Sequence, residues 1–213
     1  MTGFIERMRV KICGMTNRED AEAAVAAGAD ALGFILYEKS RRFIAMEEAI
    51  RIVETLPPFV QTVAVTVNAV KEFTNLGWRK QLKNFGVAQL HGEESPAHVK
   101  AVSKYLSVIK VFPADLAGTV VPGQYAVSAF MVDTPAAERG GTGRIFDWNL
   151  AVEFKKRITK PLILSGGLNP ENVAKAIGAV HPYAVDVASG VEASPGRKDH
   201  AKLRDFIQIC KSL

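Results

Sequence analysis

The chain has few cysteines and no long apolar run. Its 213 residues include two cysteines, Cys13 and Cys210, which cannot form a disulfide framework. No apolar stretch approaches the ~18 residues of a membrane-spanning helix, and residues Met1 to Arg9 lack the apolar core of a signal peptide. Free thiols are typical of a reducing compartment. We therefore expect a cytoplasmic protein with no disulfide bridge and no membrane partner.

Charge of one sign is not concentrated anywhere in the sequence. Lys and Arg outnumber Asp and Glu by 27 to 22, for a net charge of +5. Those basic residues are scattered, and no block of about five or six like charges occurs. This pattern argues against a nucleic-acid partner. It is typical of a solvated surface and would also help to attract a small anionic substrate.

Short β-rich apolar runs alternate with segments of helical period along the chain. We predict strands at Arg9–Cys13, Ala31–Leu36, Thr62–Val67, Val87–Leu90, Ser107–Phe112, Ala129–Asp133, Leu162–Ser165 and Ala184–Ala188. We predict helices at Arg18–Ala27, Met46–Leu56, Lys71–Phe85, Pro96–Lys104, Asp115–Val120, Asp147–Ile158, Asn169–Ala179 and His200–Lys211. Repeated strand–helix units of about 26 residues favour parallel strands with right-handed crossovers.

A closed barrel fits this pattern better than an open sheet. An open doubly wound sheet normally carries a G-x-G-x-x-G fingerprint after its first strand, and this sequence has none there. No linker rich in Pro and Ser divides the chain. The sequence therefore predicts an α/β protein with a single (β/α)8 TIM barrel, formed as one domain by residues 1–213.

Strand alternation places polar side chains inside the predicted barrel. In the first strand, Lys11 and Cys13 share the face opposite the aliphatic residues, and in the last strand Asp186 does the same. Closure makes these two strands neighbours, so Lys11 and Asp186 are expected to pair, because an isolated buried charge is very unfavourable. Gln89 points inward by the same alternation.

Active sites of such barrels lie at the C-terminal ends of the strands. Cys13 ends the first strand, where it is either a small buried hydrophobe or a general base whose pKa nearby positive charge lowers. Asp133 ends the sixth strand ahead of Pro135, where it is either a turn residue or a general acid. The two strands lie on roughly opposite sides of the barrel.

Glycine-rich segments follow the last two strands, where barrels commonly bind phosphate through backbone N–H groups. A further glycine-rich segment after the sixth strand is either a loop that closes over ligand or a surface turn. The residues that we expect at a phosphate group are Gly143, Ser165, Gly166, Gly167, Ser189 and Gly190.

Several motifs together resemble those of the phosphoribosylanthranilate isomerases of tryptophan biosynthesis. They occur in the family's order and span nearly the whole chain: K-I-C-G-M-T at Lys11–Thr16, Q-L-H-G-E at Gln89–Glu93, V-D at Val132–Asp133, G-G-T-G-R-I-F-D-W at Gly140–Trp148, L-S-G-G-L at Leu164–Leu168, V-D-V-A-S-G-V-E at Val185–Glu192 and P-G-R-K-D at Pro195–Asp199.

This resemblance implies an Amadori rearrangement of a small phosphoribosyl substrate, without metal or organic cofactor. By similarity, Asp133 protonates the ribose ring oxygen and Cys13 removes the proton from C2′. Arg42 is implied as the clamp on the anthranilate carboxylate, because a planar guanidinium binds a carboxylate bidentately. Further substrate contacts are expected from Gln89, His91 and Asp186, although a structural histidine is an equal alternative for His91. The oligomeric state is open between monomer and homodimer.

The chain departs from the family pattern at two positions. It reads Ser40-Arg41-Arg42 where S-P-R is common, so Arg41 is an alternative clamp, and it has Thr66 where an aromatic residue is common. Other functions remain as alternatives. The histidine-pathway isomerase with the same chemistry would be expected to carry aspartate in place of Cys13. A metal-dependent epimerase needs several His and Asp ligands at strand ends, and the chain has four histidines in all. A non-catalytic phosphate-binding barrel has no need of the Cys13 and Asp133 pair.

Overall fold

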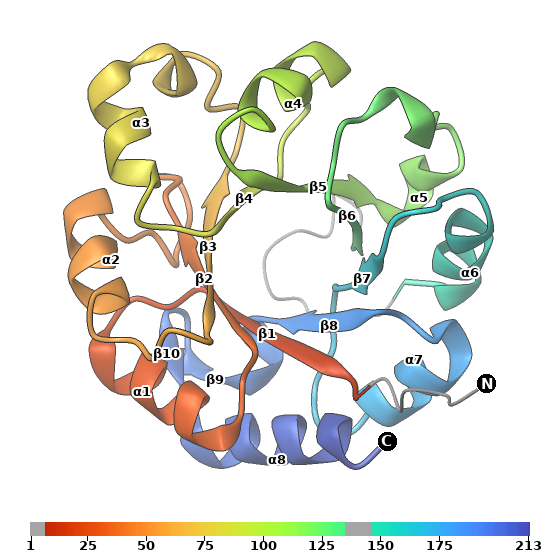
Figure 1. The fold of residues 1–213 in the computed structure, drawn as a ribbon. Coiled ribbons are helices and arrows are strands. Elements are labelled where there is room, and N and C mark those ends of the chain that lie inside the picture. The colour runs from red at the N-terminus through yellow and green to blue at the C-terminus, as the bar shows by residue number, and fades with distance from the viewer. Residues whose placement is uncertain (1–6, 135–145) are drawn as a thin grey trace.

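A computed structural model describes residues 7–134 and 146–213, and its strands close into a barrel (Figure 1). Each strand pairs in parallel with the next, and β8 pairs with β1, so the (β/α)8 prediction is confirmed. The strands are β1 (Arg9–Cys13), β2 (Ala31–Ile35), β3 (Gln61–Thr66), β4 (Val87–Leu90), β5 (Ser107–Pro113), β6 (Ala129–Asp133), β7 (Leu162–Leu164) and β8 (Ala184–Val187).

Helices form an outer ring around these strands (Figure 1). They are α1 (Arg18–Ala27), α2 (Met46–Val53), α3 (Leu76–Leu82), α4 (Pro96–Val102), α5 (Ala114–Ala117), α6 (Trp148–Lys156), α7 (Val173–Val180) and α8 (His200–Lys211). Short 3-10 turns lie at η1 (Glu72–Thr74), η2 (Pro122–Gln124) and η4 (Ser189–Val191). Within the described ranges, no helix is both long enough and apolar enough to cross a membrane.

Helix boundaries follow from local capping chemistry. The side chains of Asn17, Ser95 and Asp199 accept hydrogen bonds from backbone N–H groups of the first turns of α1, α4 and α8. Gly28 ends α1 with a φ of 100°, a left-handed conformation that glycine adopts without a steric penalty. The predicted bounds of α1 and α8 agree with the structure.

Most predicted helices extended beyond their observed bounds, and two of them began several residues too early. The segment predicted as one helix from Lys71 to Phe85 is divided into η1 and α3, because the side chain of Asn75 caps a new start by accepting the Trp78 N–H. The helix predicted from Asn169 begins only at Val173, since the Asn169 side chain accepts the N–H groups of the residues that would form the first turn.

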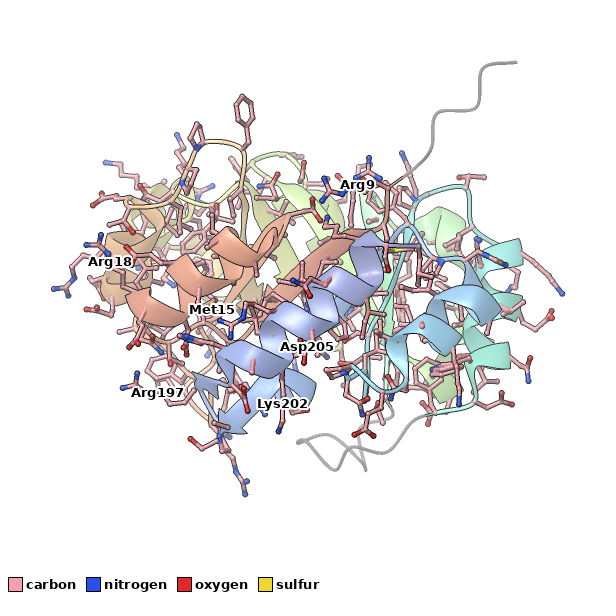
Figure 2. All side chains as sticks on the ribbon, turned by 90° about the horizontal axis from the view of Figure 1, so that it is seen from below. Arg9, Met15, Arg18, Arg197, Lys202 and Asp205 are labelled. Atoms are coloured by element: carbon pink, nitrogen blue, oxygen red, sulfur yellow. The ribbon has the colours of Figure 1, made fainter. Side chains whose placement is uncertain are left out.

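A hairpin after β8 was not predicted. It consists of β9 (Glu192–Ser194) and β10 (Arg197–Lys198), which are too short to show strand periodicity. The turn contains Gly196 with a φ of 81°. Figure 2 shows Arg197 of this hairpin at the opposite end of the barrel from Arg9, where β1 begins. The hairpin therefore lies at the C-terminal end of the strands.

Two buried clusters divide the side chains of the strands. The outward-facing residues, such as Val10 and Ile12, pack against the helices in the larger cluster. The smaller cluster fills the barrel interior with residues such as Val63, Ile109 and Met131, and it includes Cys13. The predicted inward orientation of Cys13 is therefore confirmed, and the alternation along β6 gives Asp133 the same direction as Ala129 and Met131.

Candidate active site

A buried ion pair joins the first and last strands inside the barrel. Lys11 Nζ donates to Asp186 Oδ1 at 2.6 Å, and the two residues are register partners on β1 and β8. Ser165, which follows β7, donates its hydroxyl to Asp186 Oδ2 at 3.1 Å. Both charged side chains are almost fully buried, so each depends on the other for compensation. This pairing confirms the prediction for Lys11 and Asp186.

Cys13 lies directly beside this pair. The positive charge of Lys11 acts on the Cys13 thiol as well as on Asp186. Burial raises the pKa of the thiol, an effect that Lys11 and Lys198 counteract and that Asp186 reinforces, so the pKa lies above its ordinary value. The site needs Gly33 on β2, since a Cβ there would lie 2.8 Å from Cys13 Sγ and 2.9 Å from Lys11 Nζ.

A second charged network surrounds the backbone of Cys13. Lys198 on β10 directs its ammonium to the carbonyl oxygens of Cys13 at 2.7 Å and Ala188 at 3.1 Å, and to Glu192 Oε1 at 3.1 Å. Its side chain has 0% exposure. Lys198 thus ties the end of β1 to the segment that follows β8. In the sequence, Glu192 and Lys198 stand out only as members of motifs. Their spacing in the sequence does not predict that they are in contact.

Arg42 meets Glu192 rather than open solvent. Its Nε and Nη2 donate to the two carboxylate oxygens of Glu192 at 2.8 and 2.7 Å. This pairing is the main reason why the pKa of Arg42 is raised. Burial opposes the ionisation of Glu192, but Arg42 and Lys198 outweigh it and lower the pKa of that carboxyl. Arg41 is exposed, so of the two candidate clamps only Arg42 is built into the charged network.

Asp133 lies in a different environment. Its Oδ2 is 3.2 Å from His91 Nε2, and its Oδ1 accepts the backbone N–H of Thr134 at 2.7 Å. Gln89 Nε2 in turn lies 3.4 Å from His91 Nδ1. The ring proton of a neutral histidine can sit on either nitrogen, so His91 Nε2 either donates to Asp133 or accepts its proton. His91 and Asp133 are 23% and 22% exposed, whereas Gln89 is buried beneath them.

The glycine-rich segments after β7 and β8 are held close to their neighbours. Gly166 has a φ of 93°, and a Cβ there would lie 2.6 Å from the Thr134 nitrogen. A Cβ on Gly190 would lie 1.9 Å from the carbonyl oxygen of Leu168. Only glycine therefore lets these segments approach so closely.

Backbone groups remain available in these segments. The carbonyl of Gly167 accepts from Asn172 Nδ2 at 2.9 Å, which braces the turn. Within the described residues, the N–H groups of Gly166 and Gly167 have no acceptor. Ser189 and Gly190 open the 3-10 turn η4. Ser165 is engaged elsewhere, because its N–H donates to Val132 and its hydroxyl to Asp186. Gly143 lies outside the described residues.

No group of three or more His, Cys, Asp or Glu side chains in residues 7–134 and 146–213 is arranged to hold a metal ion. The side chains described above are instead a thiol, three carboxyl groups, an imidazole, a guanidinium and two ammonium groups on the strands and on the segments that follow them. That set is suited to proton transfer on an anionic ligand.

Comparison with known proteins gives one consistent result. The family model described as "N-(5'phosphoribosyl)anthranilate (PRA) isomerase" matches residues 10–209. A relative from Geobacter sp. (strain M21), named N-(5'-phosphoribosyl)anthranilate isomerase, is 49% identical over 210 residues, which are 96% of this chain and 98% of that protein. The crystal structure of the phosphoribosyl anthranilate isomerase from Thermotoga maritima has a TM-score of 0.87 and 43% identity, and the match covers 97% of this chain and 100% of that one.

A further solved structure contains a bound molecule. It is a phosphoribosyl anthranilate isomerase in complex with reduced 1-(o-carboxyphenylamino)-1-deoxyribulose 5-phosphate. Its TM-score to this chain is 0.83 at 41% identity, with coverage of 97% of this chain and 100% of that one. The similarity therefore extends over the whole barrel, including every described strand end that carries a candidate residue.

Proposed function

The chain belongs to the N-(5'-phosphoribosyl)anthranilate isomerase family, and from that premise we propose that Cys13 and Asp133 perform its reaction as general base and general acid. It is an isomerase of tryptophan biosynthesis, which converts N-(5-phosphoribosyl)anthranilate into 1-(2-carboxyphenylamino)-1-deoxyribulose 5-phosphate by an Amadori rearrangement. The observation that carries the assignment is that Cys13 and Asp133 are the last residues of β1 and β6. Both occupy inward-facing positions at the C-terminal end of the barrel.

The first step opens the ribose ring. The Asp133 carboxyl group gives its proton to the ring oxygen, and the bond between that oxygen and C1′ breaks. The lone pair of the anthranilate nitrogen forms the new C=N bond, which leaves an iminium ion and an ionised Asp133. A carboxyl group can act in this way only if it carries a proton beforehand. Its partner His91 is compatible with that state when Nε2 accepts a hydrogen bond.

The second step removes the proton from C2′. The Cys13 thiolate takes this proton, the C–H electrons form a C1′=C2′ double bond, and the nitrogen recovers its lone pair. The resulting enolamine then moves its hydroxyl proton to C1′ and becomes the ketone. The iminium nitrogen is the electron sink for this step, so one acid and one base suffice.

The thiol must be ionised before it can accept a proton. Burial alone makes the thiolate unfavourable, and Lys11 supplies a compensating positive charge close to the sulfur. We assign Asp186 to holding Lys11 in that position, since Asp186 is nearly inaccessible. Gln89 is equally inaccessible and is assigned to orienting His91. Both residues thus act on the substrate through a neighbour.

The remaining substrate groups are anions. We assign the phosphate to the segments after β7 and β8, because the N–H groups of Gly166 and Gly167 are free to bind its oxygens and Ser189 and Gly190 form the adjoining turn. Gly143 and Ser165 are assigned as further phosphate contacts on the sequence motifs alone. The anthranilate carboxylate is assigned to Arg42.

A turnover assay with the purified chain tests the proposal. The substrate is generated from anthranilate and phosphoribosyl pyrophosphate, and its fluorescence is expected to fall when the chain is added. No fall with folded protein would contradict the isomerase activity itself. Normal rates for both Cys13→Ala and Asp133→Asn would contradict the residue assignments only. We further propose that residues 1–213 form one catalytic domain that works in the cytoplasm, where its two free thiols would stay reduced.

A further inference from the structure

We propose that Glu192, held by Lys198, is a positioning residue that fixes Arg42 with one edge of its guanidinium open for the substrate carboxylate. The inference deepens the proposed function and depends on the proposed role of Arg42. It gives a functional role to the hairpin of β9 and β10, because this hairpin contains both Glu192 and Lys198.

The geometry of the guanidinium is the first argument. Arginine has five N–H donors arranged so that a carboxylate can bind along more than one edge. Glu192 occupies the edge formed by Nε and Nη2, at 2.8 and 2.7 Å. Within the described residues, Nη1 has no acceptor. The edge formed by Nη1 and the second proton of Nη2 is therefore open to a second carboxylate.

The balance of charge is the second argument. An Arg42–Glu192 pair alone would be neutral and would place the negative charge of Glu192 near the carboxylate of the substrate. Lys198 adds a second cation in contact with Glu192, so the three side chains carry a net charge of +1. The cluster therefore still attracts an anion although Glu192 lies within it.

Rigidity is the third argument. Each of the three protons of the Lys198 ammonium has an acceptor, namely Glu192 and the carbonyls of Cys13 and Ala188. The aliphatic part of Arg42 packs on Gly14, where a Cβ would lie 2.7 Å from Arg42 Cδ. Arg42 is thus held on two sides next to the residue that follows the base. A clamp fixed in this way loses less conformational entropy when the substrate binds.

Two ligands and three variants test the inference. The first ligand is the reduced product analogue, which carries the carboxylate, and the second is the same phenylamino sugar phosphate without the carboxylate. Inhibition constants for both are measured with wild type, Glu192→Gln, Arg42→Ala and the double variant. Asp30→Asn is the control, because Asp30 is an ion-paired carboxylate at the other end of the barrel. Thermal unfolding verifies that each variant is folded.

We expect Glu192→Gln to raise the inhibition constant of the carboxylated analogue by about 10-fold, the order of one charge-assisted hydrogen bond. The inhibition constant of the other analogue should change by less than about 2-fold. In the Arg42→Ala background, Glu192→Gln should have no further effect, because Glu192 acts through Arg42. Asp30→Asn should bind both analogues like wild type.

The contrary outcomes are distinct. Equal binding of both analogues by wild type would overturn the carboxylate clamp, and the inference with it. If Arg42→Ala abolishes the preference for the carboxylated analogue but Glu192→Gln leaves that preference unchanged or increases it, only the positioning role is overturned. Equal weakening of both analogues by Glu192→Gln would reduce Glu192 to a structural residue. If Glu192→Gln does not fold, Glu192→Asp retains the charge at a shorter reach and is expected to show the same selective loss.

Discussion

The two sides of the barrel mouth differ in electrostatic character. At the ends of β1 and β8, the thiol of Cys13 is surrounded by buried full charges, those of Lys11, Asp186 and Lys198. At the ends of β4 and β6, Asp133 is partly exposed and contacts His91 and a backbone N–H group. The described contacts of Cys13 are with ionised side chains, and those of Asp133 include an imidazole and an amide.

This difference matches the two opposite proton-transfer tasks that we propose for Cys13 and Asp133. A base must lose its proton before the reaction, so adjacent ammonium groups favour the thiolate that Cys13 needs. An acid must keep its proton, and a cation in direct contact would favour its ionised form. The arrangement thus separates the thiol and the carboxyl group by environment, which is the general means by which one site runs acid and base chemistry at one pH.

Removal of the base is expected to have the largest effect. Cys13→Ala should lower kcat by at least about 100-fold, because alanine has no group that can accept the C2′ proton. Steady-state fluorescence assays measure the rate. Cys210→Ala is the matched control, since Cys210 is a buried free thiol on α8 and burial raises its pKa to about 12. A comparable loss for both variants would mean that packing, not proton transfer, explains the effect.

Removal of the acid should be of similar size. Asp133→Asn keeps the shape of the side chain and its contact with His91, but it removes the proton that opens the ring, so kcat should again fall by at least about 100-fold. Pre-steady-state measurements should show that substrate still binds. An Asp133→Asn rate within a few-fold of wild type would assign the acid to another group.

The arrangement of the charged residues on the strands could largely be predicted from the sequence, because it follows from local strand geometry. Lys11, Cys13 and Asp186 lie on strands, where alternation fixes the direction of a side chain and barrel closure fixes its neighbour. The same alternation on β6 predicts the inward direction of the Asp133 side chain.

The contacts made by loops could not be predicted in this way. Arg42, Glu192 and Lys198 lie outside the barrel strands, and Lys198 meets Cys13 across 185 positions of sequence. No periodic pattern connects residues so far apart, and the hairpin that unites them is too short to leave one. The helix boundaries near Asn75 and Asn169 were missed for a related reason, because they depend on one or two side-chain hydrogen bonds that have no periodic signal.

The carboxylate clamp is the next largest effect on the charged side. Arg42→Ala should raise the KM by about 30-fold, in line with the loss of a bidentate charged contact, and should change kcat far less. Arg41→Ala is the matched control, because Arg41 is exposed and adjacent in sequence. If Arg41→Ala raises the KM and Arg42→Ala does not, the clamp belongs to Arg41.

Lys11 allows the ionic argument to be tested by pH. Burial raises the pKa of Cys13 and Lys11 lowers it, so Lys11→Met should move the rising limb of kcat/KM to higher pH and reduce the rate at neutral pH by about 10-fold. Asp186 raises the same pKa, so Asp186→Asn should move that limb to lower pH. Lys11→Met also leaves a buried carboxylate unpaired and should lower the free energy of unfolding by about 3–5 kcal/mol.

Shifts in the same direction for Lys11→Met and Asp186→Asn would refute this electrostatic account. The pH profiles should be recorded in a Cys210→Ala background if the thiolate is followed directly by its ultraviolet absorbance, because the chain has two free thiols. Unfolding curves at each pH separate loss of activity from loss of structure.

The smallest effect of a single substitution is expected for His91→Gln, which probes the other side of the comparison. His91→Gln retains a hydrogen-bonding group beside Asp133, so kcat should fall by only about 3-fold, the order of one altered hydrogen bond. His91→Lys would instead place a permanent cation there and favour the ionised carboxyl group, which cannot donate a proton. We therefore expect the lysine variant to be slower than the glutamine variant by about 10-fold, measured as kcat with both proteins shown to be folded. Equal rates would mean that a permanent cation beside the carboxyl group does not impair proton transfer, and the contrast between the two sides would then have no catalytic meaning.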